Sequence, residues 1–428
     1  MGFRAWKRTA RMSVIPLGMA QRALVGGWLR AFGKLTDASS LELHEQTADQ
    51  LFEVLGGLKG GVMKFGQVLS VYEAVLPPEI SAVYRHRLAR LQEAARPENE
   101  AVVHGVLVED LGAHWRTLFA SFDDEPVAAA SLAQVHRAVW HDGREVAVKV
   151  QYPEAHADLL GDRDSLILVM GWFTRLVAPV LDGRAMAEDL MNRIAEELDY
   201  AREAASQRAF RAGFAGLPEF RVPEVVRQEG RVLVSEWVGG TPLAEVIASG
   251  SREERNRAGL LLTRLMFAAP VLCGRLHGDP HPGNFRLLDD GSLGVLDFGA
   301  VYRLVPGEES PLHRWLRIHL AETPDELLRT LRDVGFLRPG VQADAAGLQE
   351  LFAHSGQPAH AETFAFTPHH LRETVRRMTA SPAVALSLAF PPDLVHAQRA
   401  LGVGIGVLCQ LEAEVPFQAE ALRWLTAE

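Results

Sequence analysis

Residues 277–284 of the chain are His-Gly-Asp-Pro-His-Pro-Gly-Asn, and a short apolar run downstream ends in Asp-Phe-Gly at residues 297–299. Asp279 and Asn284 are five residues apart, and Asp297 follows Asn284 by thirteen residues. In kinase-like phosphotransfer sites, one aspartate orients or deprotonates the acceptor, while an asparagine and a second aspartate hold the magnesium ions that neutralise ATP phosphates. The spacing therefore predicts Asp279 and Asn284 as catalytic residues, and Asn284 and Asp297 as magnesium ligands.

The polar residues of this stretch have a simpler interpretation, in which they only cap turns of a helical lobe. That interpretation requires three independent agreements of residue type and spacing, so phosphotransfer is favoured. His277 is expected to support the loop through hydrogen bonds. His281 lies between two prolines and is expected to shape the turn.

Upstream, residues 145–150 (Glu-Val-Ala-Val-Lys-Val) alternate in polarity as a strand does, with successive side chains on opposite faces. Lys149 lies near the end of this strand, where a kinase-like fold places the lysine that pairs the α- and β-phosphates of ATP. A lysine on a strand is more often a solvated edge residue. The order along the chain, in which a strand lysine precedes an acidic helix, a hinge and the Asp-Asn-Asp set, favours a catalytic and nucleotide-binding role for Lys149.

The acidic helix is Glu-Glu-Leu-Asp-Tyr-Ala-Arg-Glu at residues 196–203. Glu196, Asp199 and Glu203 share one of its faces, because they are spaced at i, i+3 and i+7. A charge run on a helix is most often a solvated face. Here, however, one of these carboxylates is needed to hold Lys149, so the helix is expected to face the nucleotide site.

A second strand is predicted over residues 231–237 and is followed by a Val-Gly-Gly hinge. Glu236 and Val238, at this hinge, belong to the predicted nucleotide-binding set. The set also includes the turn before the lysine strand, which is Ala128, Ala129, Ala130 and Ser131. Because alanine has a Cβ and avoids positive φ, this turn should approach phosphates less freely than a glycine-rich loop. Nucleotide affinity or preference is therefore expected to differ from that of ordinary protein kinases, unless the alanines form a plain packed turn.

Composition narrows the class of protein. The 428 residues are 48% hydrophobic and 23% charged, which predicts a folded chain of two or three lobes. A net charge of -10 argues against a nucleic-acid binder, whose affinity depends on neutralising backbone phosphates. Cys273 and Cys409 are the only cysteines, so we expect a reducing, cytoplasmic location without a disulfide framework or a thiolate metal site.

The first 39 residues form a basic arm, in which no acidic residue precedes Asp37. Its basic residues are Arg4, Lys7, Arg8, Arg11, Arg22, Arg30 and Lys34. Interleaved apolar side chains such as Trp6 and Trp28 would let the arm lie on an anionic membrane as a peripheral contact. A basic, partly disordered leader is an equal alternative. No apolar stretch reaches the roughly 18 to 20 residues that a spanning helix requires, and Arg11 interrupts any secretory signal core.

We expect an α+β, two-lobed, protein-kinase-like fold. Residues 40–110 carry apolar positions at helical spacing and form a helical extension over the active-site cleft, residues 111–238 form an N-lobe with inserted helices, and residues 239–428 form a helical C-lobe. Within the C-lobe, Asp-Asp-Gly at residues 289–291 predicts a hairpin turn. Residues 339–358 are expected to be a surface loop with one short helix.

These motifs resemble the AarF/UbiB family of atypical kinase-like proteins, which is known for roles in isoprenoid quinone metabolism. The resemblance spans roughly residues 40–410 and rests on Lys64-Phe65-Gly66-Gln67, the alanine-rich turn, the Lys149 strand, Glu197-Leu198-Asp199, His277 to Asn284, and Asp297-Phe298-Gly299. It implies that the Lys-x-Gly-Gln segment folds over the active site and occludes the place of a protein substrate. Lys64, Gln67, Glu197 and Asp199 would then be regulatory residues. Glu203 would remain as the partner of Lys149.

Three features depart from the family's pattern. Ala133 stands where glycine is common, Ser206 stands where asparagine is frequent, and the paired C-terminal spanning helices of some relatives have no counterpart in this sequence. The first two bear on the shape of the pocket. The third leaves any contact with a membrane or an isoprenoid lipid to the N-terminal arm or a lobe surface.

The leading hypothesis is an ATP- and magnesium-dependent kinase-like enzyme with ATPase, small-molecule or lipid-linked phosphotransfer activity. Protein phosphorylation is less favoured, because the extension is expected to block large substrates. A small-molecule kinase similar to the aminoglycoside phosphotransferases also uses a His-Gly-Asp loop, but the Lys-x-Gly-Gln segment and the alanine-rich turn weigh against it. The third hypothesis is a nucleotide-gated scaffold without turnover, and Asp279 argues against it because a pure binder does not need that residue.

Overall fold

The computed structural model describes residues 98–129, 132–153, 195–307, 309–338, 340–380 and 392–425, together with a few single positions in the gaps. The basic arm and nearly all of the helical extension, including Lys64 and Gln67, lie outside the described residues. The chain divides into two compact units. The first contains Met1–Thr117, Phe122–Arg137 and Lys149–Leu198, and the second contains Leu118–Ser121, Ala138–Val148 and Asp199–Glu428.

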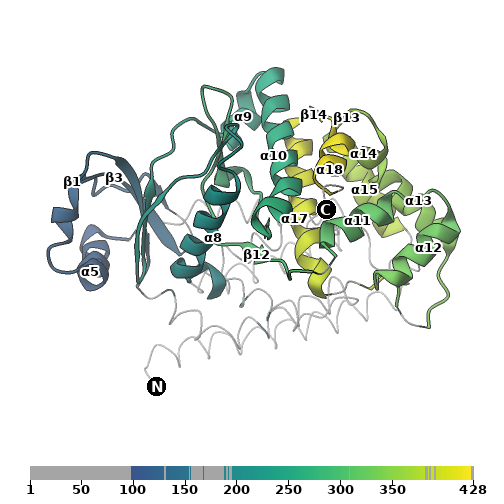
Figure 1. Cartoon of the computed structure of the whole chain (residues 1–428), viewed down its shortest axis with the longest axis horizontal. Coiled ribbons are helices and arrows are strands. Elements are labelled where there is room, and N and C mark those ends of the chain that lie inside the picture. The colour runs from purple at the N-terminus through teal and green to yellow at the C-terminus, as the bar shows by residue number, and fades with distance from the viewer. Residues whose placement is uncertain are drawn as a thin grey trace, which may run out of the picture. The chain divides into compact units, whose positions relative to one another are not determined.

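A six-stranded sheet contains the predicted lysine strand (Figure 1). Its strands are β1 (Phe119–Phe122), β2 (Ala128–Ala129), β3 (Ala133–Trp140), β4 (Glu145–Gln151), β6 (Val225–Glu229) and β7 (Val232–Glu236). Their order is β1-β3-β4-β7-β6, and β2 pairs with β3. In β4, Val146, Val148 and Val150 are at most 1% exposed, whereas Ala147 and Lys149 are half-buried. The alternation that the sequence predicts for this strand is therefore confirmed.

Two other elements in the first unit lie before this sheet in the chain. Helix α5 (Glu100–Leu111) begins after Asn99, whose side chain accepts a hydrogen bond from the backbone N–H of Ala101. A short 3-10 turn, η2 (Trp115–Leu118), buries the ring of Trp115. That ring packs edge-on against Phe122 at a centroid distance of 5.0 Å. Helix capping and this aromatic contact fix the segment locally.

Helix α8 (Tyr200–Gly213) carries the last residues of the predicted acidic run. Asp199 caps its start by accepting a hydrogen bond from the backbone N–H of Arg202. Tyr200, Ala204 and Phe210 are at most 2% exposed. Tyr200 and Ala204 pack in one buried cluster with Leu233, and Phe210 packs in the larger hydrophobic core.

A second, four-stranded sheet contains the predicted hairpin. Its strands are β5 (Phe220–Arg221), β8 (Thr241–Pro242), β10 (Phe285–Leu287) and β11 (Leu293–Val295), in the order β5-β11-β10-β8. β10 and β11 pair antiparallel, with Phe285 opposite Val295, around a turn in which Gly291 has a φ of +75°. Only glycine adopts that conformation readily, so the Asp-Asp-Gly turn prediction is confirmed.

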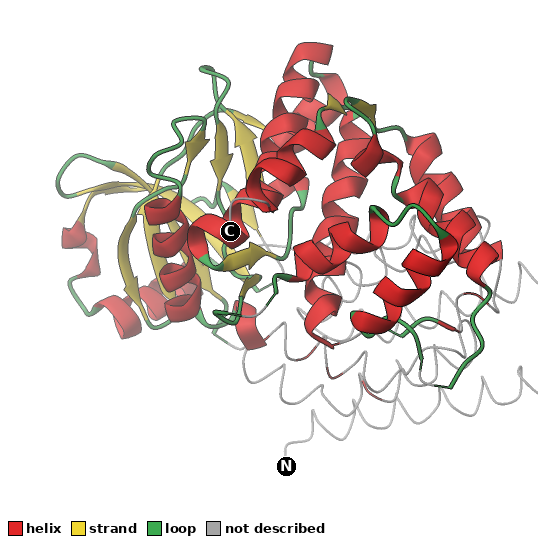
Figure 2. Cartoon of the chain, turned by 45° about the vertical axis from the view of Figure 1, so that its right-hand side comes forward, coloured by secondary structure: helices red, strands yellow, loops and turns green. Residues whose placement is uncertain are grey.

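The rest of the second unit is mainly helical (Figure 2). Its helices are α9 (Leu243–Ser249), α10 (Arg252–Cys273), α11 (Pro311–His319), α12 (Pro324–Asp333), α13 (Ala345–Ser355), α14 (Gln357–His360), α15 (Pro368–Ala380), α17 (Pro392–Leu411) and α18 (Phe417–Leu425). Two short strands, β13 (Phe364–Ala365) and β14 (Glu414–Val415), pair with each other. Helix α10 packs against α17 and α18, and the rings of Phe267 and Phe417 meet there at 5.2 Å.

Residues 339–358 contribute more to the core than a surface loop would. Their helix α13 buries Leu348 and Leu351 in a cluster with Leu327 and Leu331 of α12. The predicted helix is present, but its apolar face is packed against a neighbouring helix.

The α+β, kinase-like fold class that the sequence predicts is confirmed. Among the described residues, none of the helices combines the length and the apolar character that crossing a membrane requires.

Candidate active site

The predicted catalytic loop begins at His277, the last residue of β9 (Arg275–His277), which pairs with β12 (Val301–Arg303). The backbone N–H of Gly278 donates to the carbonyl of Ala300 at 2.7 Å. A Cβ at Gly278 would lie 2.2 Å from a ring carbon of Tyr302 and 2.8 Å from the Ala300 carbonyl oxygen. Only glycine therefore allows the loop to pass so close to the segment that follows Asp-Phe-Gly.

Three of the four residues predicted for catalysis and metal binding, all except Lys149, belong to adjoining segments. The side-chain amide of Asn284 donates to the Asp279 carbonyl oxygen at 2.9 Å and to the Asp279 carboxylate at 3.3 Å. The carbonyl of Asn284 accepts from the backbone N–H of Leu296 at 2.9 Å, which extends the β10–β11 pairing. Asn284 and Asp297 therefore lie at the same end of the hairpin. One carboxylate oxygen of Asp297 accepts from the backbone N–H of Gly299 at 3.0 Å.

The histidines occupy the roles expected for them. His277 is 4% exposed and its Nε2 donates to the carbonyl of Asp297 at 2.9 Å. Burial lowers the pKa of His277, so its ring is neutral at physiological pH. His281 is exposed, and its Nδ1 accepts from the backbone N–H of Gly283 at 3.2 Å within the 3-10 turn η3 (Pro282–Asn284).

An aromatic cluster joins α8 to the Asp-Phe-Gly motif. Phe298 is 1% exposed, and its ring lies 5.2 Å from that of Phe210 on α8 and 6.1 Å from that of His277. At the other end of α8, Arg202 donates to the carbonyl of Val301 at 3.2 Å. Two contacts at separate points therefore hold α8 to the segment around the motif.

Of the acidic residues on this helix, Glu203 is the one that needs an internal partner. Glu203 is 2% exposed, whereas Glu196 and Glu197 are half-buried and Asp199 is exposed as the cap of α8. A buried carboxylate is costly unless a cation or hydrogen-bond donors compensate it. Lys149 and Glu203 belong to different units, and their pairing stays a prediction.

The alanine-rich turn is described only in part. Ala128 and Ala129 are exposed in β2, opposite Val135 and Gln134 of β3, while Ala130 and Ser131 lie outside the described residues. The predicted contact of this turn with phosphates therefore stays a prediction.

Two buried polar residues of β3, the strand that pairs with this turn, form hydrogen bonds that the sequence did not reveal. Gln134 and His136 are each 1% exposed. Gln134 accepts from the backbone N–H of Glu98 at 2.8 Å and lies 3.0 Å from Nε2 of His136, whose Nδ1 donates to the carbonyl of Asp123 at 2.9 Å. Burial lowers the pKa of His136, so the ring stays neutral. The only signal in the sequence is their spacing of two residues in a predicted strand, which puts both side chains on one side of the strand. The structure shows that this side is buried.

The hinge after β7 is pinned by Arg286, which the sequence also did not reveal. Nη1 of Arg286 donates to the carbonyl of Gly240 at 2.8 Å, and the guanidinium lies 5.9 Å from the ring centre of Trp237. Gly240 has a φ of +91°. Val238 is buried, and a Cβ on Gly294 of β11 would lie 2.9 Å from its Cγ1, so the hinge packs closely on the hairpin. The carboxylate of Glu236 forms ion pairs with Arg211 and Arg221.

The donor set suits magnesium, which prefers oxygen ligands and uses few protein carboxylates. Because the Asn284 amide nitrogen donates to Asp279, its amide oxygen is the ligand atom that Asn284 offers, beside the carboxylate of Asp297. A second group of metal-type side chains comprises Glu100, His104 and Asp124. These side chains contact one another and Arg116: Asp124 pairs with Arg116 at 3.1 Å, and the two acids face opposite nitrogens of His104.

Residues 90–323 match the ABC1 atypical kinase-like domain. This match covers more than half of the chain. The chain belongs to the ABC1 atypical kinase-like family. The resemblance to AarF/UbiB proteins that the motifs indicate is thereby confirmed.

Individual relatives agree with this assignment. The rat protein named "Atypical kinase COQ8B, mitochondrial" is 33% identical over 287 residues, which cover 66% of this chain and 52% of that protein. The zebrafish protein of the same name is 29% identical over 395 residues, covering 90% of this chain and 61% of the relative. The chain thus spans about half the length of the curated relatives it matches.

One solved structure covers nearly the whole chain. The complex of Rv3197 with erythromycin from Mycobacterium tuberculosis is 40% identical in sequence, with a TM-score of 0.66, over 92% of this chain and 99% of that one.

Proposed function

We propose that this protein binds ATP with magnesium and uses it for ATP hydrolysis or for phosphoryl transfer to a small or lipid-linked acceptor. The observation that carries the proposal is the contact of Asn284 with Asp279, together with the hairpin that brings Asp297 to the same end. A protein that only binds nucleotide has no need for an aspartate in the position of Asp279.

In the proposed phosphoryl transfer, each predicted site residue has a separate role. Asp279 would orient the acceptor hydroxyl or water and take its proton, as a bond forms from the acceptor oxygen to the γ-phosphorus and the bond to ADP breaks. Lys149, held by Glu203, would pair the α- and β-phosphates. Magnesium on Asn284 and Asp297 would neutralise charge on the phosphates when bound. All other contributions to phosphoryl transfer would come from the protein's own side chains.

Two further parts of the proposal rest on the family. Lys64 and Gln67, acting on Glu197 and Asp199, would exclude protein substrates and regulate the site. The acceptor would then be a small molecule or a lipid, including one of isoprenoid quinone metabolism, and the basic N-terminal arm would provide a peripheral membrane contact.

A macrolide of the erythromycin class is a second candidate ligand. The protein in the solved erythromycin complex is 40% identical to this chain over 92% of its length. Erythromycin carries several hydroxyl groups, which are chemically competent phosphoryl acceptors. The macrolide would therefore act as an acceptor or as a regulator of ATP turnover.

The test is ATP turnover by the purified chain, measured as ADP formed, in the wild type and in Asp279→Ala. We expect the variant to lose about 10²- to 10⁴-fold in turnover, because an acid–base group contributes that much. The dissociation constant for ATP should change little. Equal turnover in both proteins would refute the role of Asp279, and binding without turnover in the wild type would favour the scaffold.

Erythromycin is then added to the same assay. Phosphorylated erythromycin detected by mass spectrometry would make it an acceptor, and a changed rate of ADP formation without product would make it a regulator. If erythromycin neither binds nor changes turnover, macrolides are removed from the proposal.

A further inference from the structure

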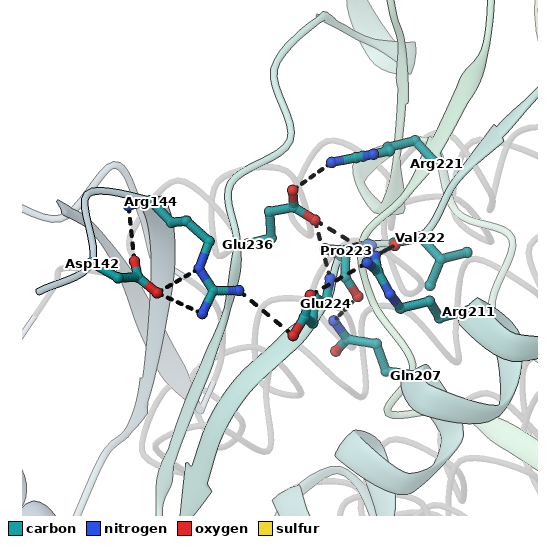
Figure 3. Close-up of polar contacts among 9 residues, drawn as sticks. All are labelled: Asp142, Arg144, Gln207, Arg211, Arg221, Val222, Pro223, Glu224 and Glu236. Atoms are coloured by element: carbon teal, nitrogen blue, oxygen red, sulfur yellow. Dashed lines mark hydrogen bonds and ion pairs between the residues drawn. The ribbon is translucent and has the colours of Figure 1, made fainter. Parts of the chain in front are cut away.

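Six charged side chains of alternating sign form a continuous network beside the end of β7, where the hinge begins (Figure 3). We refer to them as the hinge network: Asp142, Arg144, Glu224, Arg211, Glu236 and Arg221. Arg144 lies 2.8 Å from Asp142 and 3.6 Å from Glu224. Arg211 lies 3.3 Å from Glu224 and 3.6 Å from Glu236, and Arg221 forms an ion pair with Glu236.

Glu236 is the least exposed member of this network. Its side chain is 23% exposed, whereas the other five are 37% to 49% exposed. Oε1 accepts from Arg221, and Oε2 faces Arg211 and lies 3.4 Å from the backbone N–H of Glu224. Both carboxylate oxygens of Glu236 therefore contact side chains or backbone of this chain.

The two arginines connect Glu236 to the elements that carry predicted site residues. Arg211 lies on α8, two helical turns beyond Glu203, and also donates to the carbonyl of Val222 at 2.9 Å. Arg221 lies on β5, where it is paired with Gly294 of β11. β11 ends two residues before Asp297. One carboxylate thus links the start of the hinge to the helix of Glu203 and to the strand that leads into Asp297.

Gly240, at the far end of the hinge, contacts the opposite edge of the four-stranded sheet that contains β5 and β11. Gly240 accepts from Arg286 of β10, the strand that begins directly after Asn284. The next two residues, Thr241 and Pro242, form the edge strand β8, which pairs with β10. The sheet order is β5-β11-β10-β8, so one edge is held through Glu236 and the other through Gly240. The strands leading to both metal ligands lie between these two attachments.

We infer that Glu236 is a positioning residue, which acts through Arg211 and Arg221 to fix the hinge relative to Asn284 and Asp297. The inference rests on the proposed nucleotide-binding function, in which the hinge would contact the base and the hairpin the phosphates. Because most of the network is partly exposed, salt screens it, and its effect falls as ionic strength rises.

The test is a double-mutant cycle of Glu236→Gln, Arg221→Gln and the pair, measured on the dissociation constant for magnesium-ATP and, separately, on kcat. A partly exposed ion pair shifts an equilibrium by at most about fivefold, so loss of both pairs of Glu236 predicts an effect of at most about 25-fold. The control is the cycle of Glu229→Gln and Arg227→Gln, an ion pair of 2.6 Å on β6 that does not contact the hinge network.

We expect the single variants Glu236→Gln and Arg221→Gln to share their loss, so that the double variant is no worse than the worse single one. Raising NaCl from about 0.1 M to about 1 M shortens the Debye length from about 10 Å to about 3 Å and should reduce the ratio between wild type and Glu236→Gln. The control cycle should leave affinity and kcat unchanged.

The inference is overturned if Glu236→Gln keeps the affinity and kcat of the wild type, or if its only change is a lower melting temperature. It is also overturned if the losses of Glu236→Gln and Arg221→Gln add up in the double variant. If the wild type binds no nucleotide, the proposed function fails first, and that result is distinguishable because it precedes any comparison of variants.

Discussion

Replacing Arg264 with methionine is expected to destabilise the second unit by about 3 to 5 kcal/mol, because it leaves the buried carboxylate of Glu420 and the half-buried carboxylate of Glu219 without their cation. Arg264 lies in α10 and is 15% exposed. Its Nε and Nη2 donate to Glu420 of α18 at 3.0 and 2.6 Å, and its Nη1 donates to Glu219 at 2.6 Å. The side chains of Glu420 and Glu219 are only 7% and 17% exposed.

The pH dependence of the loss identifies its cause. Burial alone would raise the pKa of Glu219, but hydrogen bonds from the backbone and from Arg264 hold the pKa below its usual value. Without Arg264, the hydrogen bond and the positive charge that lower the pKa of Glu219 are lost, and burial raises that pKa. The penalty on Glu219 is then complete above its folded-state pKa and disappears as protonation neutralises this carboxyl. The deficit of the variant should therefore shrink between pH 7.5 and pH 5.

The assay is urea unfolding followed by tryptophan fluorescence at both pH values. Arg252→Met is the matched control, because Arg252 is on the same helix and 2.6 Å from Glu414, but these side chains are 75% and 41% exposed. We expect Arg252→Met to cost less than about 1 kcal/mol. The reasoning is refuted if Arg264→Met costs no more than Arg252→Met, or if its deficit grows as the pH falls.

Two other predictions concern stability. Burial lowers the pKa of His319 to about 4, so its contribution to stability is complete above pH of about 6.5, the unfolded value, and is lost as the pH falls toward 4, by about 3 kcal/mol in total. Urea unfolding from pH 7.5 to 4.5 should show a shallower slope in His319→Phe than in the wild type, and equal slopes would contradict this origin. In α17, Gly402→Ala should raise the melting temperature, because no atom lies within 4 Å of the new Cβ and alanine favours a helix by about 1 kcal/mol. Gly404→Ala should lower it, because its Cβ would lie 2.2 Å from Sδ of Met266, and a gain in both variants would contradict the packing.

The sequence predicted the features that depend on local patterns. Alternating valines define β4, and Asp-Asp-Gly defines the hairpin turn because glycine alone supplies the positive φ there. The spacing of Asp279, Asn284 and Asp297 was also readable as a local pattern. The structure brings Asn284 into contact with Asp279 and places Asp297 at the same end of the hairpin, while their catalytic and metal-binding roles stay predictions.

Contacts between distant segments were not predictable. Arg264 and Glu420 are 156 residues apart, and neither has a neighbour that marks it as one half of a buried pair. The same applies to Arg286, whose hydrogen bond reaches 46 residues back to Gly240. Glu236 was placed correctly beside the hinge, but one sequence cannot show that its carboxylate faces arginines from α8 and β5.

The most direct test of the central claim is thermal unfolding of the full chain with ATP, with and without magnesium, in the wild type and in Asp297→Asn. Asp289→Asn, an exposed substitution in the turn of the same hairpin, is the control. Ligand at about 100 times its dissociation constant should stabilise the wild type and the control by roughly 2.7 kcal/mol. We predict a magnesium-dependent shift that Asp297→Asn loses and Asp289→Asn keeps. No shift in the wild type, or an equal shift in Asp297→Asn, would contradict a magnesium–nucleotide site at this hairpin.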